Sequence, residues 1–103
     1  MGAVRIARRR VSPPCRLLLS PRAVADLEEI AAYIARDNPV RAPTFIDALE
    51  AQCVALARTP LGYPPREDLA SRLRMGVHGR YLILFRLLSH DDAVRVERVL
   101  YGA

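Results

Sequence analysis

Two segments in the first half of the chain repeat apolar residues every three or four positions, the spacing of an amphipathic helix. The first stripe is Val24, Leu27, Ala31 and Ile34, and the second is Ala42, Phe45, Leu49, Cys53 and Leu56. Asp37-Asn38-Pro39 separates them, a turn so short that the two helices are predicted to pack antiparallel as a hairpin. Pro43 indicates that the second helix either begins near this residue or has a distorted first turn.

After a loop over residues 61–68, the apolar period changes to two, which predicts strands. The expected strands are a segment in which Leu73, Met75 and Val77 alternate with arginine, residues 80–88, and residues 93–101. A further short apolar run, residues 16–19, precedes the first helix. The order β-α-α-β-β-β predicts an α+β fold, in which the helical hairpin packs on one face of an antiparallel sheet.

The strand over residues 80–88 is apolar on both faces. One face carries Tyr81, Ile83, Phe85 and Leu87, and the other carries Leu82, Leu84, Arg86 and Leu88. A single hairpin covers only one side of a sheet, so a second apolar face needs another cover. Either the loop around Tyr63 or a chain terminus folds over it, or a partner protein binds there.

A length of 103 residues allows one domain, which we assign to residues 15–103, preceded by a flexible basic extension over residues 1–14. All 16 basic residues are arginines, and there are 11 acidic residues. The net charge of +5 arises entirely within residues 1–16, so the domain itself is neutral. Direct nucleic-acid binding is therefore not expected. The unbroken apolar runs, such as residues 81–85, are too short to span a membrane.

The sequence contains no recognisable enzyme or metal motif. Its two cysteines and two histidines lack the spacing of a metal site, and no phosphate-binding glycine loop or nucleophile elbow is present. We therefore expect neither a cofactor nor a metal. The low cysteine content and the absence of a signal peptide favour a cytoplasmic protein.

Charge is distributed unevenly within the domain. The helical part, residues 20–57, has a net charge of −3, whereas residues 58–86 carry six arginines against two acids. Arg72 and Arg74 project from one side of a strand and can grip carboxylates or phosphates, although a solvated strand face gives the same pattern. Arg98 shares a face with Val94 and Val96 unless a bulge intervenes. It then needs a carboxylate partner, for which Asp26, Glu28 and Glu29 are candidates.

Six stretches, in the expected order, carry a resemblance to a known family. Residues 20–34 (SPRAVADLEEIAAYI), 37–39 (DNP) and 45–49 (FIDAL) are similar to the helical hairpin of ParE toxins. Residues 73–75 (LRM), 78–83 (HGRYLI) and 98–102 (RVLYG) are similar to the strands of the same family. The resemblance covers residues 17–102 and identifies a member of the RelE/ParE toxin–antitoxin superfamily.

The resemblance implies a type II toxin that a ParD-like antitoxin holds inactive in a hetero-oligomer. Several ParE toxins poison DNA gyrase, so we expect a toxin that binds this protein target and is not an enzyme. The target is expected to contact Arg72, Arg74, Arg80, Arg98 and Tyr101. The antitoxin is expected to contact Leu82, Ile83, Leu84, Phe85 and Arg86.

Two alternatives remain at this point. RelE-like relatives are ribosome-dependent mRNA endonucleases that use clustered basic residues and a C-terminal Tyr or His. Here the corresponding set would be Arg80, Arg86, Arg98 and Tyr101. The absence of lysine favours ParE, whereas Tyr101 stands where many ParE sequences have His. A binding module without toxicity is the other alternative.

Overall fold

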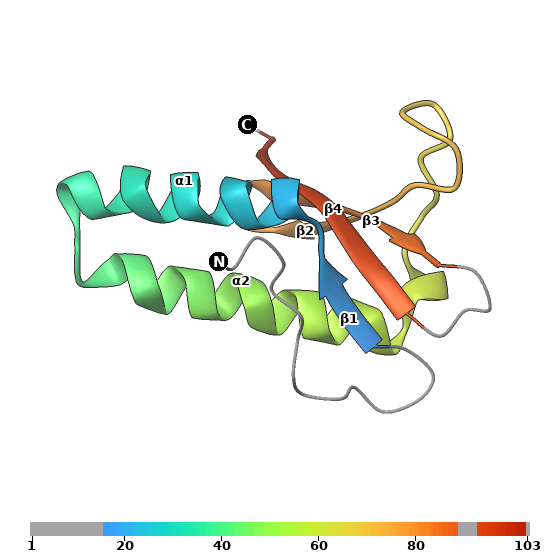
Figure 1. The fold of residues 1–103 in the computed structure, drawn as a ribbon, viewed down its shortest axis with the longest axis horizontal. Helices are drawn as coiled ribbons and strands as arrows, with labels where there is room; N and C mark the ends of the chain where they lie inside the picture. The colour runs from blue at the N-terminus through green and yellow to red at the C-terminus, as the bar shows by residue number, and fades with distance from the viewer. Residues whose placement is uncertain (1–15, 89–92, 103) are drawn as a thin grey trace.

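The computed structural model describes residues 16–88 and 93–102, which form two helices and a four-stranded sheet (Figure 1). The elements are β1 (Arg16–Leu19), α1 (Pro21–Asp37), α2 (Arg41–Arg58), a 3-10 turn (Pro60–Gly62), β2 (Arg74–His78), β3 (Tyr81–Leu87) and β4 (Ala93–Tyr101). The predicted α+β fold and element order are confirmed. The predicted extension over residues 1–14 and the turn over residues 89–92 lie outside the described residues.

The sheet is mixed, which corrects the prediction of a wholly antiparallel sheet. Its strand order is β1-β4-β3-β2, and β4 pairs antiparallel with β3 but parallel with β1. Parallel neighbours need a long crossover connection, which the two helices, β2 and β3 together supply. The alternating pattern shows that a strand is half buried, but it does not indicate the direction of its neighbour.

The residues at the first turn explain where each helix begins. The Ser20 hydroxyl accepts the N–H of Ala23 at 3.0 Å, as an N-cap does, and donates to the Glu97 carbonyl at 2.9 Å. The start of α1 is thereby fixed to β4. Pro43 is the third residue of α2, where a backbone N–H has no partner within the helix. The helix therefore begins before Pro43 and does not lose a hydrogen bond to it.

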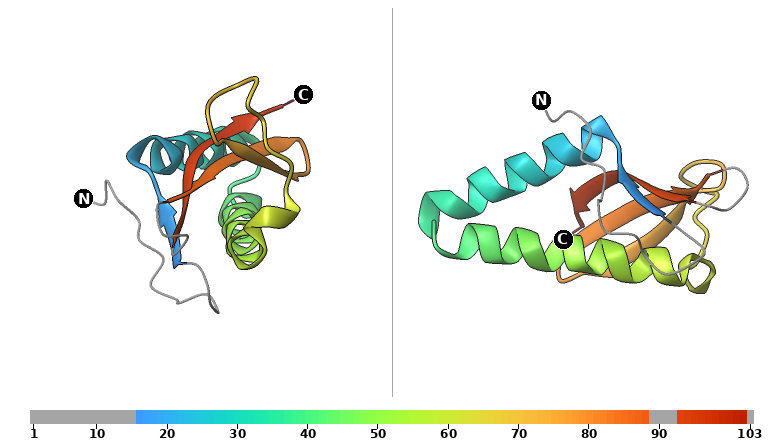
Figure 2. Two further views of the ribbon diagram at one scale, coloured as in Figure 1. Left: turned by 90° about the vertical axis from the view of Figure 1, so that its right-hand side faces the viewer. Right: turned by 60° about the horizontal axis from the view of Figure 1, so that its bottom comes forward.

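The hairpin covers one face of the sheet, and its turn projects beyond the sheet edge (Figures 1 and 2). On β3, this covered face carries Tyr81, Ile83 and Phe85. The ring of Tyr81 lies 5.5 Å from that of Phe45 on α2, and the ring of Phe85 packs edge-on against Tyr63 at 5.7 Å. The core lies between this face and the helices.

A bulge in β4 changes which residues face the core. Phe85 lies opposite Val96 and Leu84 lies opposite Arg98, so Glu97 is an extra residue in the strand. Beyond the bulge, Val99 is buried with 2% exposure, and Arg98 lies on the other face. The sequence predicts Arg98 on the face of Val96 only if β4 has no bulge. Because the bulge is present, Arg98 lies on the opposite face.

Candidate functional site

The five residues predicted to contact the target do not lie in one place. Arg74 pairs with Phe85 at one end of β3, whereas Tyr101 pairs with Tyr81 at the other end. Arg80 lies beside Tyr101, and Arg72 lies near Arg74. Arg98 lies against α1, three residues before Tyr101 on β4, and lines the same cleft as Tyr101. The structure therefore does not bring the predicted residues together into one basic patch.

The loop between α2 and β2 is fixed by its own hydrogen bonds. Arg66 donates to both carboxylate oxygens of Asp68, at 2.9 and 2.7 Å, and the N–H of Arg72 donates to Glu67 Oε2 at 3.1 Å. Arg72 has a φ of 62°, a left-handed conformation that is rare for a residue other than glycine. Arg74 donates to the Tyr63 carbonyl at 2.6 Å. Arg74 thus serves in part to hold this loop.

Arg98 and Asp26 form an ion pair that joins the last strand to α1. Arg98 Nε donates to Asp26 Oδ2 at 2.7 Å, and Nη2 donates to Oδ1 at 2.9 Å. The backbone N–H of Val99 donates to the same Oδ2 at 2.9 Å. The hydrogen bond to Asp26 raises the pKa of Arg98. Of the three carboxylates that the sequence offered as partners, Asp26 is the one used.

This arrangement is explained by the short length of β1. Its pairing with β4 ends at Val96, so the rest of β4 has an edge without a neighbouring strand. Ser20 fills the first part of this edge, since its N–H donates to the Val96 carbonyl at 2.9 Å. Asp26, one turn and a half further along α1, satisfies the next outward N–H, that of Val99. The backbone N–H of Ser20, the N-cap of α1, and the side chain of Asp26 thus take the place of a strand.

Aromatic rings form a continuous row at the far end of the sheet. His78, Tyr81 and Tyr101 lie opposite one another on three neighbouring strands, and Phe45 of α2 packs against His78 and Tyr81. Tyr81 and Tyr101 meet edge-on at 5.4 Å. Burial, together with the neighbouring Tyr101, raises the pKa of Tyr81. Arg80 donates to the Tyr101 hydroxyl at 3.3 Å, and this bond raises the pKa of Arg80.

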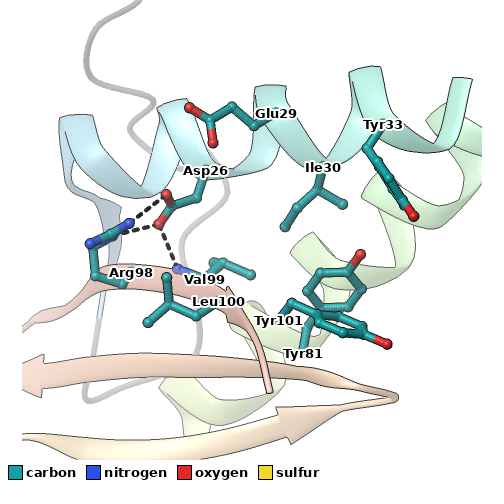
Figure 3. A pocket seen from close by; sticks show the side chains of 9 residues that line it. All are labelled: Asp26, Glu29, Ile30, Tyr33, Tyr81, Arg98, Val99, Leu100 and Tyr101. Carbon is teal, nitrogen blue, oxygen red and sulfur yellow. Dashed lines mark hydrogen bonds and ion pairs between the residues drawn. The ribbon is translucent and has the colours of Figure 1, made fainter. Parts of the chain in front are cut away.

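A cleft of about 440 Å³ opens between this end of the sheet and α1 (Figure 3). Ile30 and Tyr33 form its helix side, and Tyr81 and Tyr101 form its sheet side. The Asp26–Arg98 pair closes its inner end. The rings of Tyr33 and Tyr101 are 65% and 57% exposed, so the outer end of the cleft is open and aromatic.

The predicted antitoxin residues divide between the core and the opposite face of the sheet. Ile83 and Phe85 have no exposed surface and pack beneath the hairpin, so their side chains cannot contact a partner in the folded protein. Leu84 is only 8% exposed. Leu82 and Arg86 lie half-buried on the face away from α2. Of the five residues, these two present side chains to the surface.

The loop over residues 63–73 contacts part of that face, as one sequence-based alternative required. Arg66 reaches Met75 at 3.5 Å, and Arg86 donates to the Ser71 carbonyl at 3.1 Å. The coverage ends before Val77, which is 54% exposed. We call the remaining uncovered strip, which crosses three strands, the outer apolar row. It consists of Val77, Leu82 and Leu100.

The set proposed for the endonuclease alternative does not converge. Arg98 is paired with Asp26, and Arg86 lies 3.4 Å from a carboxylate oxygen of Glu97. Arg80 and Tyr101 remain as a pair. His78, the only histidine among the described residues, packs against Phe45.

Residues missed by the sequence reasoning belong to surfaces that depend on the fold. Ile30 and Tyr33 appeared only as helix residues, and Val77 and Leu100 only as strand residues. Tyr33 lies outside the apolar stripe of its helix. An aromatic residue at such an exposed position indicates a contact surface, and this signal is present in the sequence. The row of Val77, Leu82 and Leu100 required the register between strands, which the sequence does not provide.

Within the described segments, no group of three or more His, Cys, Asp or Glu side chains could hold a metal ion. None of the described helices is long and apolar enough to cross a membrane. Cys53 is buried, and burial raises its pKa to about 12, so its thiol is protonated at neutral pH. It is a core residue, as its place on the helical stripe indicated.

Comparisons with known proteins agree with the fold. A family model described as the ParE toxin of the type II toxin–antitoxin system parDE matches residues 17–103. A solved structure of a chromosomal ParDE system from P. aeruginosa superposes with a TM-score of 0.77 at 16% identity, covering 87% of this chain and 98% of the other. The RelBE2 toxin–antitoxin complex from Mycobacterium tuberculosis gives a TM-score of 0.66 at 23% identity, with coverages of 85% and 98%. No curated protein matches the chain.

Proposed function

We propose that this chain, which belongs to the ParE toxin family of type II toxin–antitoxin systems, inhibits growth by binding DNA gyrase in the cytoplasm rather than by catalysis. The arrangement of the arginines carries this proposal. Arg98 and Arg86 both face carboxylates of the same chain, at 2.7 and 3.4 Å. A nuclease needs free cations around the scissile phosphate, whereas a binding protein uses such pairs to hold its surface in shape.

The proposal includes a ParD-like antitoxin that covers the outer apolar row. Burying a leucine side chain stabilises a complex by about 1.5–3 kcal/mol, and this row offers two leucines and a valine. Leu84, which the sequence predicts as a contact residue, lies on the same face but is only 8% exposed. Leu82 is therefore the central contact residue on this face.

Two assays run on one preparation test the mechanism. The purified toxin should inhibit gyrase supercoiling and stabilise cleaved DNA, and it should leave mRNA intact in a ribosome-coupled translation reaction. Tyr101→Phe should change growth inhibition by less than about twofold, because the ring is retained. Loss of a catalytic hydroxyl from an endonuclease would cost about 10²–10⁴-fold in rate. Cleaved mRNA together with an inactive Tyr101→Phe variant would establish the endonuclease instead.

The antitoxin surface is tested by Leu82→Glu, with Leu61→Glu as the matched control. Both leucines reach solvent, but Leu61, at 73% exposure, lies on the 3-10 turn after α2, away from the row. Leu82→Glu should weaken antitoxin binding at least about tenfold, and Leu61→Glu should not. Equal affinities for the two variants would show that the antitoxin binds elsewhere.

A further inference from the structure

The cleft between α1 and β4 has the dimensions and composition of a binding site. Its volume of about 440 Å³ lies within the range of about 300–1,000 Å³ typical of sites that hold a ligand. Its walls are Ile30 and Tyr33 on one side and Tyr81 and Tyr101 on the other. Tyrosine is enriched among residues that dominate the energy of protein interfaces. Two of these tyrosines, Tyr33 and Tyr101, are more than half exposed.

The strand edge that borders the cleft offers backbone hydrogen-bonding groups. In an antiparallel pair, alternate residues direct their N–H and C=O to opposite sides of the strand. The N–H of Gly102 donates to the Arg80 carbonyl at 2.7 Å, on the side of β3, and that of Val99 faces α1. Tyr101 therefore directs its backbone groups toward the cleft. An extended protein segment can pair with such an edge.

Positive charge at the open end of the cleft favours a bound segment that carries a carboxylate. The guanidinium of Arg36 lies 5.8 Å from the centre of the Tyr33 ring, and Arg80 donates to the Tyr101 hydroxyl. Each exposed ring thus has a cation beside it. A carboxylate placed between Arg36 and Arg80 would be attracted to both. Glu29, the second acidic residue of the lining, lies toward the inner end and interacts electrostatically with Arg98.

We propose that this cleft receives an extended segment of the target protein, with one large apolar side chain between Tyr33 and Tyr101 and an adjacent carboxylate facing Arg36 and Arg80. The inference rests on the proposed function and names the site through which it is exerted. The cleft and the antitoxin row meet at Leu100, which lines both, whereas Tyr33 lies on the helix side of the cleft alone. Tyr33 is then a contact residue for the target and not for the antitoxin.

The test measures growth inhibition, gyrase inhibition, antitoxin affinity and thermal stability for Tyr33→Ala and Tyr33→Phe in the full chain. Val40→Ala is the matched control, since Val40 is an apolar residue with 82% exposure at the hairpin turn. Tyr33→Ala should reduce growth and gyrase inhibition about tenfold or more, which is the loss expected of a central interface residue. Its melting temperature and antitoxin affinity should match those of the parent. Tyr33→Phe and Val40→Ala should retain full activity.

Each outcome decides between the two proposals. A Tyr33→Ala variant that keeps full activity overturns the cleft proposal, and so does one that loses antitoxin affinity to the same extent as activity. A parent chain that inhibits growth but not gyrase overturns the gyrase assignment alone, and the growth data then decide the cleft. A parent chain that inhibits neither overturns the proposed function, and the cleft proposal with it.

Discussion

Replacing Asp26 by alanine should destabilise the protein more than replacing its partner Arg98. Asp26 is 7% exposed and accepts three hydrogen bonds, two from the Arg98 guanidinium and one from the Val99 N–H. Alanine removes all three. The backbone bond has no substitute, because β1 ends before this part of the strand and α1 excludes water from it. Asp26 therefore acts as an anchor for the strand edge as well as an ion-pair partner.

The magnitudes follow from exposure. The Arg98 side chain is 34% exposed, so solvent screens the ion pair, and we count about 1 kcal/mol for it. Leaving the buried Val99 N–H without an acceptor costs about 1–3 kcal/mol. Asp26→Ala should thus lower the free energy of unfolding by about 2–4 kcal/mol, and Arg98→Ala by about 1–2 kcal/mol. Asp26→Asn retains a carbonyl oxygen for Val99 and should resemble Arg98→Ala.

Urea unfolding of the three variants and of the Asp26→Ala/Arg98→Ala double variant measures these differences. The double variant should be no less stable than Asp26→Ala alone, because the guanidinium has no partner once the carboxylate is gone. The midpoints should shift with an unchanged denaturant slope. If Arg98→Ala costs as much as Asp26→Ala, the ion pair dominates and the backbone anchor contributes little, which would refute the reasoning.

Three further predictions concern single residues. The pKa of Cys53 is about 12 in the folded chain and near 9.0 without burial, so the unfolded state loses this proton at lower pH than the folded state. The free energy of unfolding should therefore fall as the pH rises above about 9. In Cys53→Ala, the free energy of unfolding should fall less steeply with pH. Arg72→Gly should be about 1 kcal/mol more stable than Arg72→Ala in urea unfolding, because the φ of 62° strains any residue with a Cβ. A Cβ on Gly102 would lie 2.7 Å from Leu82 Cγ, so Gly102→Ala should displace Leu82 and weaken antitoxin binding about tenfold in calorimetry; unchanged affinity would remove Leu82 from that surface.

The helices and most of the core could be predicted from the sequence because their signals are local. The spacing of Val24, Leu27 and the later apolar residues fixes which side of α1 is buried, and all the residues needed for that inference lie within a few turns. The Ser20 cap is equally local, since the hydroxyl and the N–H that it accepts are three residues apart. Burial of Ile83 and Phe85 follows from alternation once one face of β3 is known to be covered. The sequence does not indicate which face that is.

The parts of the site that could not be placed from the sequence depend on two strands or on a strand and a helix. Five residues were grouped because they are basic or aromatic and lie within 30 positions of one another. A strand rises about 3.3 Å per residue, so Arg74 and Arg80, at opposite ends of a hairpin, are separated by most of its length. These two residues are therefore close in sequence but far apart in space. The fold instead pairs Arg98 with Asp26, which is 72 residues away.

The bulge at Glu97 explains why the pattern of a single strand does not predict the position of Arg98. Up to Val96 the alternation of β4 points Arg98 toward the core, and an arginine there would need full desolvation, at a large energetic cost. One extra residue moves Arg98 to the other face and Val99 into the core, and it leaves the Val99 N–H directed at α1. The bulge and Asp26 therefore act together to satisfy the part of the β4 edge that the short first strand leaves without a neighbour. They allow a helix to take the place of a strand along the second half of β4, and the cleft lies where that helix and the strand diverge.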